Sequence, residues 1–194
     1  MGRFSGRIMH LLDSLRADHA DITAIRRDIH AHPELAFEEH RTAALVAARL
    51  EALGIETHRG VGKTGVVGVL RAGSSQRAIG LRADMDALPM EETNTFAHRS
   101  VHKGKMHGCG HDGHTTMLLG AARYLAETRN FAGTAVFVFQ PAEEGLGGAR
   151  AMIKDNLFTR FPCDEIYGLH NSPNGKPGRI AVFPGLLVAV HRPR

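Results

Sequence analysis

The stretch G-T-A-V-F-V-F-Q at residues 133–140 decides the fold. Its centre is entirely apolar, which is typical of a strand that is covered on both faces in the middle of a sheet. Two carboxylates, Glu143 and Glu144, follow it after Pro141 and Ala142, and glycines follow them in turn. The sequence therefore predicts a buried strand that ends in a tight loop carrying two adjacent acidic side chains.

Segments of helical and β-like character alternate along the rest of the chain. The spacing of apolar side chains predicts helices over residues 8–31, 38–53, 114–127 and 145–154. Short apolar runs bounded by turn residues predict further strands over 55–58, 66–70, 78–82, 165–170 and 179–183. This alternation predicts an α/β fold, with a mixed sheet and helices on both faces. The helix at 114–127 is expected to bury Met117, Leu118, Ala121, Ala122 and Leu125.

Composition narrows the class of protein. The chain has 194 residues and a net charge of +4, from 24 Lys and Arg against 20 Asp and Glu. The basic residues are scattered rather than clustered, so we expect no nucleic-acid partner. No apolar run approaches the length of a membrane span, so we expect no membrane association. Two cysteines cannot form a disulfide framework, and we expect a reducing, cytoplasmic setting.

Donor side chains suited to a transition metal lie in three separate segments. M-H-G-C-G-H-D-G-H at 106–114 supplies Cys109 and His111, the loop after the central strand supplies Glu144, and Y-G-L-H at 167–170 supplies His170. Thiolate, imidazole and carboxylate groups bind zinc and neighbouring metals. Glu143, beside Glu144, is free to act as a general base on water. The combination predicts a metal site for hydrolysis.

Each of these residues also has a purely structural alternative. Two acids at a helix start favour the helix dipole without any metal, and a histidine at a strand end is often only hydrogen-bonded. Other polar groups receive supporting roles: Asp84 and Asp86 orient ligands or substrate, and Asp112 holds a ligand imidazole. His107 and His114 are expected to contact substrate or to support the ligands. Dipole placement accounts for His30 and His32, and packing accounts for Cys163.

Five motifs in order carry a resemblance to a known family. They are D-I-H-A-H-P-E-L-A-F-E-E at 28–39, L-R-A-D-M-D-A-L-P at 81–89, M-H-G-C-G-H-D-G-H at 106–114, F-Q-P-A-E-E-G at 139–145 and Y-G-L-H-N at 167–171. The chain resembles the hippurate hydrolase and N-acyl-amino-acid amidohydrolase family, which is part of the aminoacylase and carboxypeptidase-type di-metal peptidases. The resemblance covers residues from about 8 to about 185.

The resemblance implies a two-metal site and an amide-cleaving activity. Cys109, His111, Glu144 and His170 match the metal ligands, and Glu143 matches the general base. The ions would be zinc or manganese, with cobalt as a third candidate. The substrate would be a small N-acyl amino acid, cleaved to a carboxylic acid and an amino acid.

Members of this family are about twice as long as this chain. We therefore expect residues 1–194 to form the N-terminal part of the metal-dependent catalytic domain, without the lid and dimerisation domain or the C-terminal half. The expected consequences are an exposed sheet edge, impaired activity, a missing metal-binding histidine that His191 does not replace, and no family-type homodimer. Two alternatives remain open: a non-catalytic fragment that binds metal or a small molecule, and a structural zinc site.

Overall fold

A five-stranded mixed sheet forms the centre of the protein. The computed structural model describes residues 11–172, 175–176, 178–182 and 184. The strand order across the sheet is β1-β2-β4-β3-β5. The strands are β1 (Glu56–Val61), β2 (Gly65–Ala72), β3 (Ala78–Asp84), β4 (Gly133–Gln140) and β5 (Glu165–Gly168). Pairs β1·β2 and β2·β4 are antiparallel, whereas β3 is parallel to both β4 and β5.

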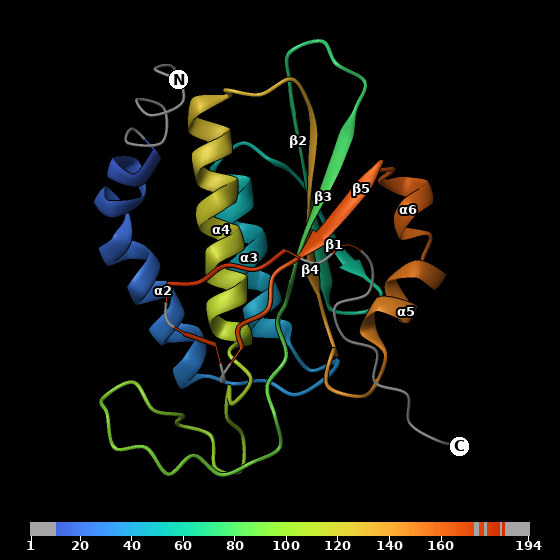
Figure 1. Cartoon of the computed structure of the whole chain (residues 1–194). Coiled ribbons are helices and arrows are strands. Elements are labelled where there is room, and N and C mark those ends of the chain that lie inside the picture. Colours follow the sequence, from blue (N-terminus) through green and yellow to red (C-terminus); the bar gives the residue numbers. More distant parts are fainter. Residues whose placement is uncertain (1–10, 173–174, 177, 183, 185–194) are drawn as a thin grey trace.

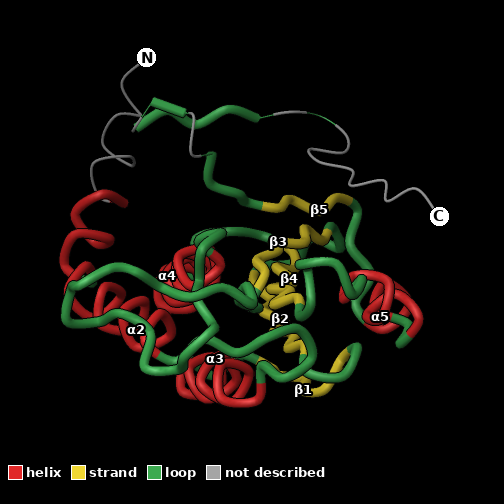
Figure 2. The backbone as a smooth tube through the Cα atoms, turned by 90° about the horizontal axis from the view of Figure 1, so that it is seen from below, coloured by secondary structure: helices red, strands yellow, loops and turns green. Residues whose placement is uncertain are grey.

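Helices cover both faces of this sheet, as predicted (Figure 1). Figure 2 shows α2, α3 and α4 together on one face and α5 on the other. The larger layer comprises α2 (His19–Ala31), α3 (His40–Ala52) and α4 (His111–Thr128). The smaller layer comprises α5 (Gly148–Lys154) and the short α6 (Leu157–Arg160). The expected α/β architecture is therefore confirmed.

The central strand β4 explains the apolar run from which the fold was predicted. Alternate side chains of a strand point to opposite faces. Phe137 and Phe139 enter the core under α2, α3 and α4, whereas Val136 and Val138 enter the second core with Met152 of α5. Because both faces are covered, the strand carries no polar side chain on either face of its centre.

Some predicted boundaries and orientations are wrong. Helix α4 begins at His111 rather than at residue 114, because Gly110 adopts a left-handed conformation (φ 91°) that allows the chain to turn directly into the helix. Helix α5 begins at Gly148, not at residue 145. Met117, expected to be buried, is 48% exposed, and Leu119 is buried instead.

Two further expectations concern the ends of the chain. Strand β5 ends at Gly168, and residues 179–182 form no strand, so the strand predicted at 179–183 is wrong for the part that the structure describes. Phe183 lies outside the described residues, as do residues 8–10 of the first predicted helix and His191. Residues 11–17 are helical and lead through a turn at Asp18 into α2.

The edge of the sheet at β5 is exposed, as expected. All four of its residues are exposed, including Ile166 and Tyr167, and Leu169 beyond the strand is 44% exposed. Among the described residues β5 pairs only with β3. Separately, within the described part of the chain we find no helix that is long and apolar enough to cross a membrane.

The loop that joins β4 to α5 depends on a glycine at its far end. A Cβ atom added to Gly148 would lie 1.6 Å from the carbonyl oxygen of Pro141, which is well inside contact distance. The Gly148 N–H also donates to the carbonyl of Ala142 at 2.9 Å. The two ends of the loop that carries Glu143 and Glu144 are thus in close backbone contact.

We predict that Gly148→Ala lowers the free energy of unfolding by at least about 2 kcal/mol, because the loop must move to admit the methyl group. Gly113→Ala is the matched control. Position 113 lies inside α4 with no atom within 4 Å of an added Cβ, so alanine should stabilise the helix by about 0.5–1 kcal/mol. Urea unfolding of both variants measures the difference, and equal effects would contradict the prediction.

Candidate metal centre

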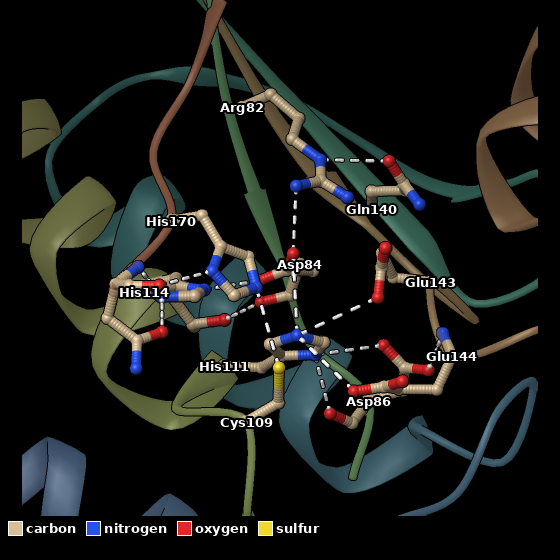
Figure 3. A network of polar contacts seen from close by, with 12 residues as sticks. Arg82, Asp84, Asp86, Cys109, His111, His114, Gln140, Glu143, Glu144 and His170 are labelled. Carbon is tan, nitrogen blue, oxygen red and sulfur yellow. Dashed lines mark hydrogen bonds and ion pairs between the residues drawn. The ribbon is translucent and has the colours of Figure 1, made fainter. Parts of the chain in front are cut away.

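The candidate residues meet at one end of the sheet (Figure 3). Strands β3, β4 and β5 are parallel in this region, so the segments that follow them lie at the same edge, where α/β proteins form their binding sites. Asp84 and Asp86 come from the end of β3, Glu143 and Glu144 from the loop after β4, and His170 from the segment after β5. Cys109 and His111 arrive from the other direction at the start of α4. The structure thus brings all the predicted ligands together.

The imidazole of His111 is the centre of the cluster. Its Nδ1–H donates to the backbone carbonyl of Asp86 at 2.9 Å, which leaves a lone pair on Nε2 when the ring is neutral. That nitrogen faces carboxylate oxygens of Asp84, Glu144 and Glu143 at 3.6, 3.8 and 3.9 Å. A lone pair that faces three carboxylates is stable only when a proton or a metal cation lies between them.

Two of these facing atoms are unsatisfied. His111 Nε2 and Glu144 Oε1 are both buried, and neither has a hydrogen-bond partner within the described structure. Buried polar atoms are nearly always paired, so two such atoms that face each other point to an absent group. Cys109 Sγ completes a set whose ligand atoms all lie within 4.8 Å of one another. The donor set and its spacing fit a divalent transition metal.

His170 extends the cluster on the side of the thiol. Its Nε2 lies 3.4 Å from Cys109 Sγ. A second set of donors within 4.8 Å of one another contains Asp84, His111, His114 and His170. Cys109 and His111 therefore stand between Glu144 on one side and His170 on the other, which is an arrangement that can hold two ions close together.

Negative charge accumulates in this cluster. Burial, reinforced by the neighbouring Glu144 carboxylate, raises the pKa of the Cys109 thiol to about 12. Burial and Glu144 also raise the pKa of Glu143. Burial opposes ionisation of Asp84, but the hydrogen bond from His114 and the charge of Arg82 outweigh it and hold its pKa at about 2. A bound cation would remove this repulsion and ionise the thiol.

Glu143 differs from its neighbour in being accessible. Its side chain is 35% exposed, and it lies at the rim of the cluster with one oxygen toward His111. Glu144, by contrast, is anchored: its backbone N–H donates to Asp86 Oδ2 at 2.9 Å. The loop thus points one carboxylate inward, toward the other candidate ligands, and leaves the second one partly exposed at the rim.

A buried carboxylate beneath the loop fixes its position. Glu39 is fully buried and accepts hydrogen bonds from the Ala142 N–H and from the hydroxyl of Thr64. Ala142 itself has a left-handed backbone (φ 49°), which is uncommon for a residue with a Cβ. Glu39 thus secures the strained residue directly before Glu143.

Asp86 contacts two of the candidate ligands, whereas Asp112 contacts other partners. Asp86 contacts both His111 and Glu144. The carboxylate of Asp112 turns away from these ligands and binds Arg26 at 2.7 Å and His30 at 2.8 Å on α2. Asp112 therefore joins two helices instead of holding a ligand imidazole. His111 and Asp112 are consecutive on α4, so their side chains leave the helix about 100° apart and face different neighbours.

Two histidines have environments that their sequence positions do not reveal. His30 is buried and bonded to both Asp112 and Glu92, which raises its pKa, so dipole placement alone does not account for it. His107 is 4% exposed, and neither ring nitrogen has a partner among the described residues. Burial lowers the pKa of His107 to about 4. These contacts join residues up to 82 positions apart, which no local spacing signals.

Comparison with known proteins agrees with this geometry. A model of the peptidase family M20/M25/M40 matches residues 80–190, which is more than half of the chain. The chain belongs to this family. The matched region includes the ends of β3 and β4 and the start of α4, from which the candidate ligands come.

Individual relatives match almost the whole chain. It is 49% identical over 181 residues to a hippurate hydrolase from Campylobacter jejuni, covering 93% of this chain and 47% of the relative. It is 40% identical over 171 residues to an N-acetyldiaminopimelate deacetylase from Listeria welshimeri, covering 87% and 46%. A dinuclear metal-binding peptidase from Bacillus subtilis superposes with a TM-score of 0.77 at 38% identity, covering 82% and 44%. The chain spans about half the length of these relatives.

We predict that the chain binds Co²⁺ through Cys109, with a thiolate-to-cobalt charge-transfer band in the near-ultraviolet. Cys109→Ser should remove this band, because a hydroxyl is a poor ligand that remains protonated. Cys163→Ser is the matched control, since Cys163 lies outside the cluster and should leave the band unchanged. A band that survives in Cys109→Ser and disappears in Cys163→Ser would contradict the assignment.

Proposed function

We propose that this chain carries the catalytic site of a metal-dependent amidohydrolase. The reaction is cleavage of the amide bond of small N-acyl amino acids, such as hippurate, to a carboxylic acid and a free amino acid. The observation that carries this proposal is that the two adjacent glutamates in the loop after β4 have different surroundings. Glu144 points its unsatisfied oxygen at His111, whereas the accessible Glu143 lies beside it at the rim.

The named relatives support this substrate class. A hippurate hydrolase and an N-acetyldiaminopimelate deacetylase both act on an acyl group joined to an amino-acid nitrogen. The acyl groups differ, but the bond is the same. The choice of acyl group and amino acid is therefore open within the class.

The residues proposed to hold the metal are Cys109, His111, Glu144 and His170. Two ions are expected, as in the dinuclear relative, and the mixed set of donors suits zinc or manganese, with cobalt as a third candidate. When bound, the ions would supply Lewis acidity, which polarises the amide carbonyl and makes water more acidic. Asp84 and Asp86 keep the imidazoles of His114 and His111 in orientation.

Glu143 is the proposed catalytic residue. It takes a proton from the attacking water as the water adds to the amide carbonyl, and it returns a proton to the departing nitrogen. Burial and the adjacent Glu144 carboxylate raise the pKa of Glu143, which makes it a better proton acceptor than an ordinary glutamate. Its partial exposure leaves room for substrate, since a fully enclosed carboxylate could not reach the reacting atoms.

The remaining expectations belong to this proposal. The described residues form the N-terminal part of a metal-dependent catalytic domain that works in the cytoplasm on a small-molecule substrate. Neither nucleic acid nor membrane is expected as a partner, and a family-type homodimer is not expected. The second candidate function is a non-catalytic fragment that binds metal or a small molecule. The exposed β5 edge, beside which His170 lies, favours it.

We predict metal-dependent hydrolysis of hippurate or of another member of a panel of N-acetyl and N-benzoyl amino acids, with zinc or manganese added. Glu143→Gln and Glu143→Ala should lower kcat by roughly 10²–10⁴-fold, because they remove the proton acceptor. Glu127→Gln, which alters a half-exposed glutamate on α4, is the matched control and should retain full activity.

Metal content, measured on each variant, separates the two functions. Loss of turnover in Glu143→Ala with the metal still bound supports the hydrolase. Bound metal in the unaltered chain without turnover on any substrate supports the binding fragment. Hydrolysis that is equally fast in Glu143→Ala would refute the role of Glu143.

A further inference from the structure

His170 is the candidate ligand with the weakest support from its own strand. It lies two residues beyond β5, which is four residues long, exposed at every position, and paired only with β3 among the described strands. The last contact of this segment with the sheet is a long one, from the Leu169 N–H to the Arg82 carbonyl at 3.5 Å. The strand alone therefore does not explain how His170 keeps its position beside Cys109.

His114 reaches this segment from the opposite side. It lies on the first turn of α4 and is only 1% exposed. Its Nδ1 is 2.6 Å from Asp84 Oδ1, and a carboxylate oxygen can only accept, so Nδ1 carries the proton. Nε2 is then an acceptor, and the backbone N–H of Asn171 donates to it at 3.0 Å. The side-chain oxygen of Asn171 also lies 2.8 Å from this nitrogen, but an amide oxygen cannot donate to Nε2, so the bond from the backbone N–H is the one that joins the two residues.

Asn171 in turn sets the orientation of His170. The Nδ1–H of His170 donates to the carbonyl of Asn171 at 2.6 Å. This bond leaves the lone pair on Nε2, the atom that lies 3.4 Å from Cys109 Sγ. The Asn171 side chain also lies close to Gly110, where an added Cβ would be 3.0 Å from it. Asn171 is thus held between α4 and the preceding glycine.

These contacts form one continuous chain from the sheet to the metal centre. It runs from Asp84 to His114, from His114 to Asn171, and from Asn171 to His170. Figure 3 shows Asp84, His114 and His170 beside Cys109. We infer that His114 is a positioning residue that holds His170 in its metal-binding orientation through Asn171. Both nitrogens of His114 are already engaged, so it is not itself a ligand. The inference rests on the metal centre proposed above.

The test is Co²⁺ binding to the full chain, followed by visible absorption and competition with a chelator. His114→Ala should weaken Co²⁺ binding by roughly 10–100-fold, the usual effect of removing a group that orients a ligand. His19→Ala, which removes an exposed histidine at the start of α2, is the control and should bind normally. His114→Asn keeps a donor near Asp84, but its side chain is too short to place an acceptor where Nε2 meets the Asn171 N–H. It should therefore fold as the unaltered chain does and show the same loss of Co²⁺ affinity.

A double-mutant cycle with His170→Ala tests whether the effect passes through His170. If His114 acts only by positioning, His114→Ala should weaken binding no further in the His170→Ala background. Normal Co²⁺ affinity in folded His114→Asn would overturn the inference. So would an undiminished effect of His114→Ala in the absence of His170, because His114 would then act on the metal directly. Absence of Co²⁺ binding in the unaltered chain would instead refute the metal centre itself.

Discussion

The parallel pairing of β3 with β4 is the constraint on which the site depends. Its register places Asp84 opposite Gln140, so the two strands end side by side and their following loops leave from the same edge. Two contacts fix this end of the pair: the Met85 N–H donates to the Gln140 carbonyl at 3.0 Å, and Arg82 donates to the Gln140 side chain at 2.8 Å. A shift of one residue would turn Asp84 to the other face of the sheet and remove the partner of His114.

Several carboxylates are buried around this edge of the sheet, and they are paired with basic side chains or with backbone N–H groups. Asp112, on the first turn of α4, meets Arg26 and His30 of α2. Glu39 meets the backbone of the loop after β4. Each of these carboxylates lies where two elements meet. The hydrogen bonds and ion pairs that it makes therefore also fix how the two elements are placed. The cluster around His111 Nε2 departs from this pattern, because His111 Nε2 and Glu144 Oε1 face each other and neither has a hydrogen-bond partner among the described residues.

Much of the fold could be predicted from the sequence, because the deciding signals are local. A run of apolar residues indicates a strand that is covered on both faces. The bounds predicted for β4 from such a run match the observed ones. The strand expected at 179–183 failed for its described part because an apolar pattern does not show whether a neighbouring strand is available to pair with it. The start of α4 was placed three residues late because the left-handed Gly110, not a side-chain cap, begins the helix.

The sequence predicted which candidate residues meet at the site, but it did not predict the hydrogen bonds and ion pairs that hold the surrounding residues. Donor residue types and their motifs identified Cys109, His111, Glu144 and His170 as a set, and the structure brings them together. The partners of Asp112, His30 and His114 lie 30–86 positions away or on another helix, and only tertiary packing brings them into contact. A histidine-rich motif shows that imidazoles gather, but it does not show which of them binds and which holds a neighbour.

The exposed position of β5 divides the site into parts of different stability. Asp84, His111 and His114 belong to elements that are buried in the main core, and they open only when much of the protein unfolds. His170 follows an exposed strand that pairs with β3 alone among the described strands, and exposed segments with few buried contacts are the ones that open at low cost in folded proteins. The candidate metal centre therefore combines residues of buried elements with one residue of an exposed segment. A cation bound by both His111 and His170 would also hold that segment against the core.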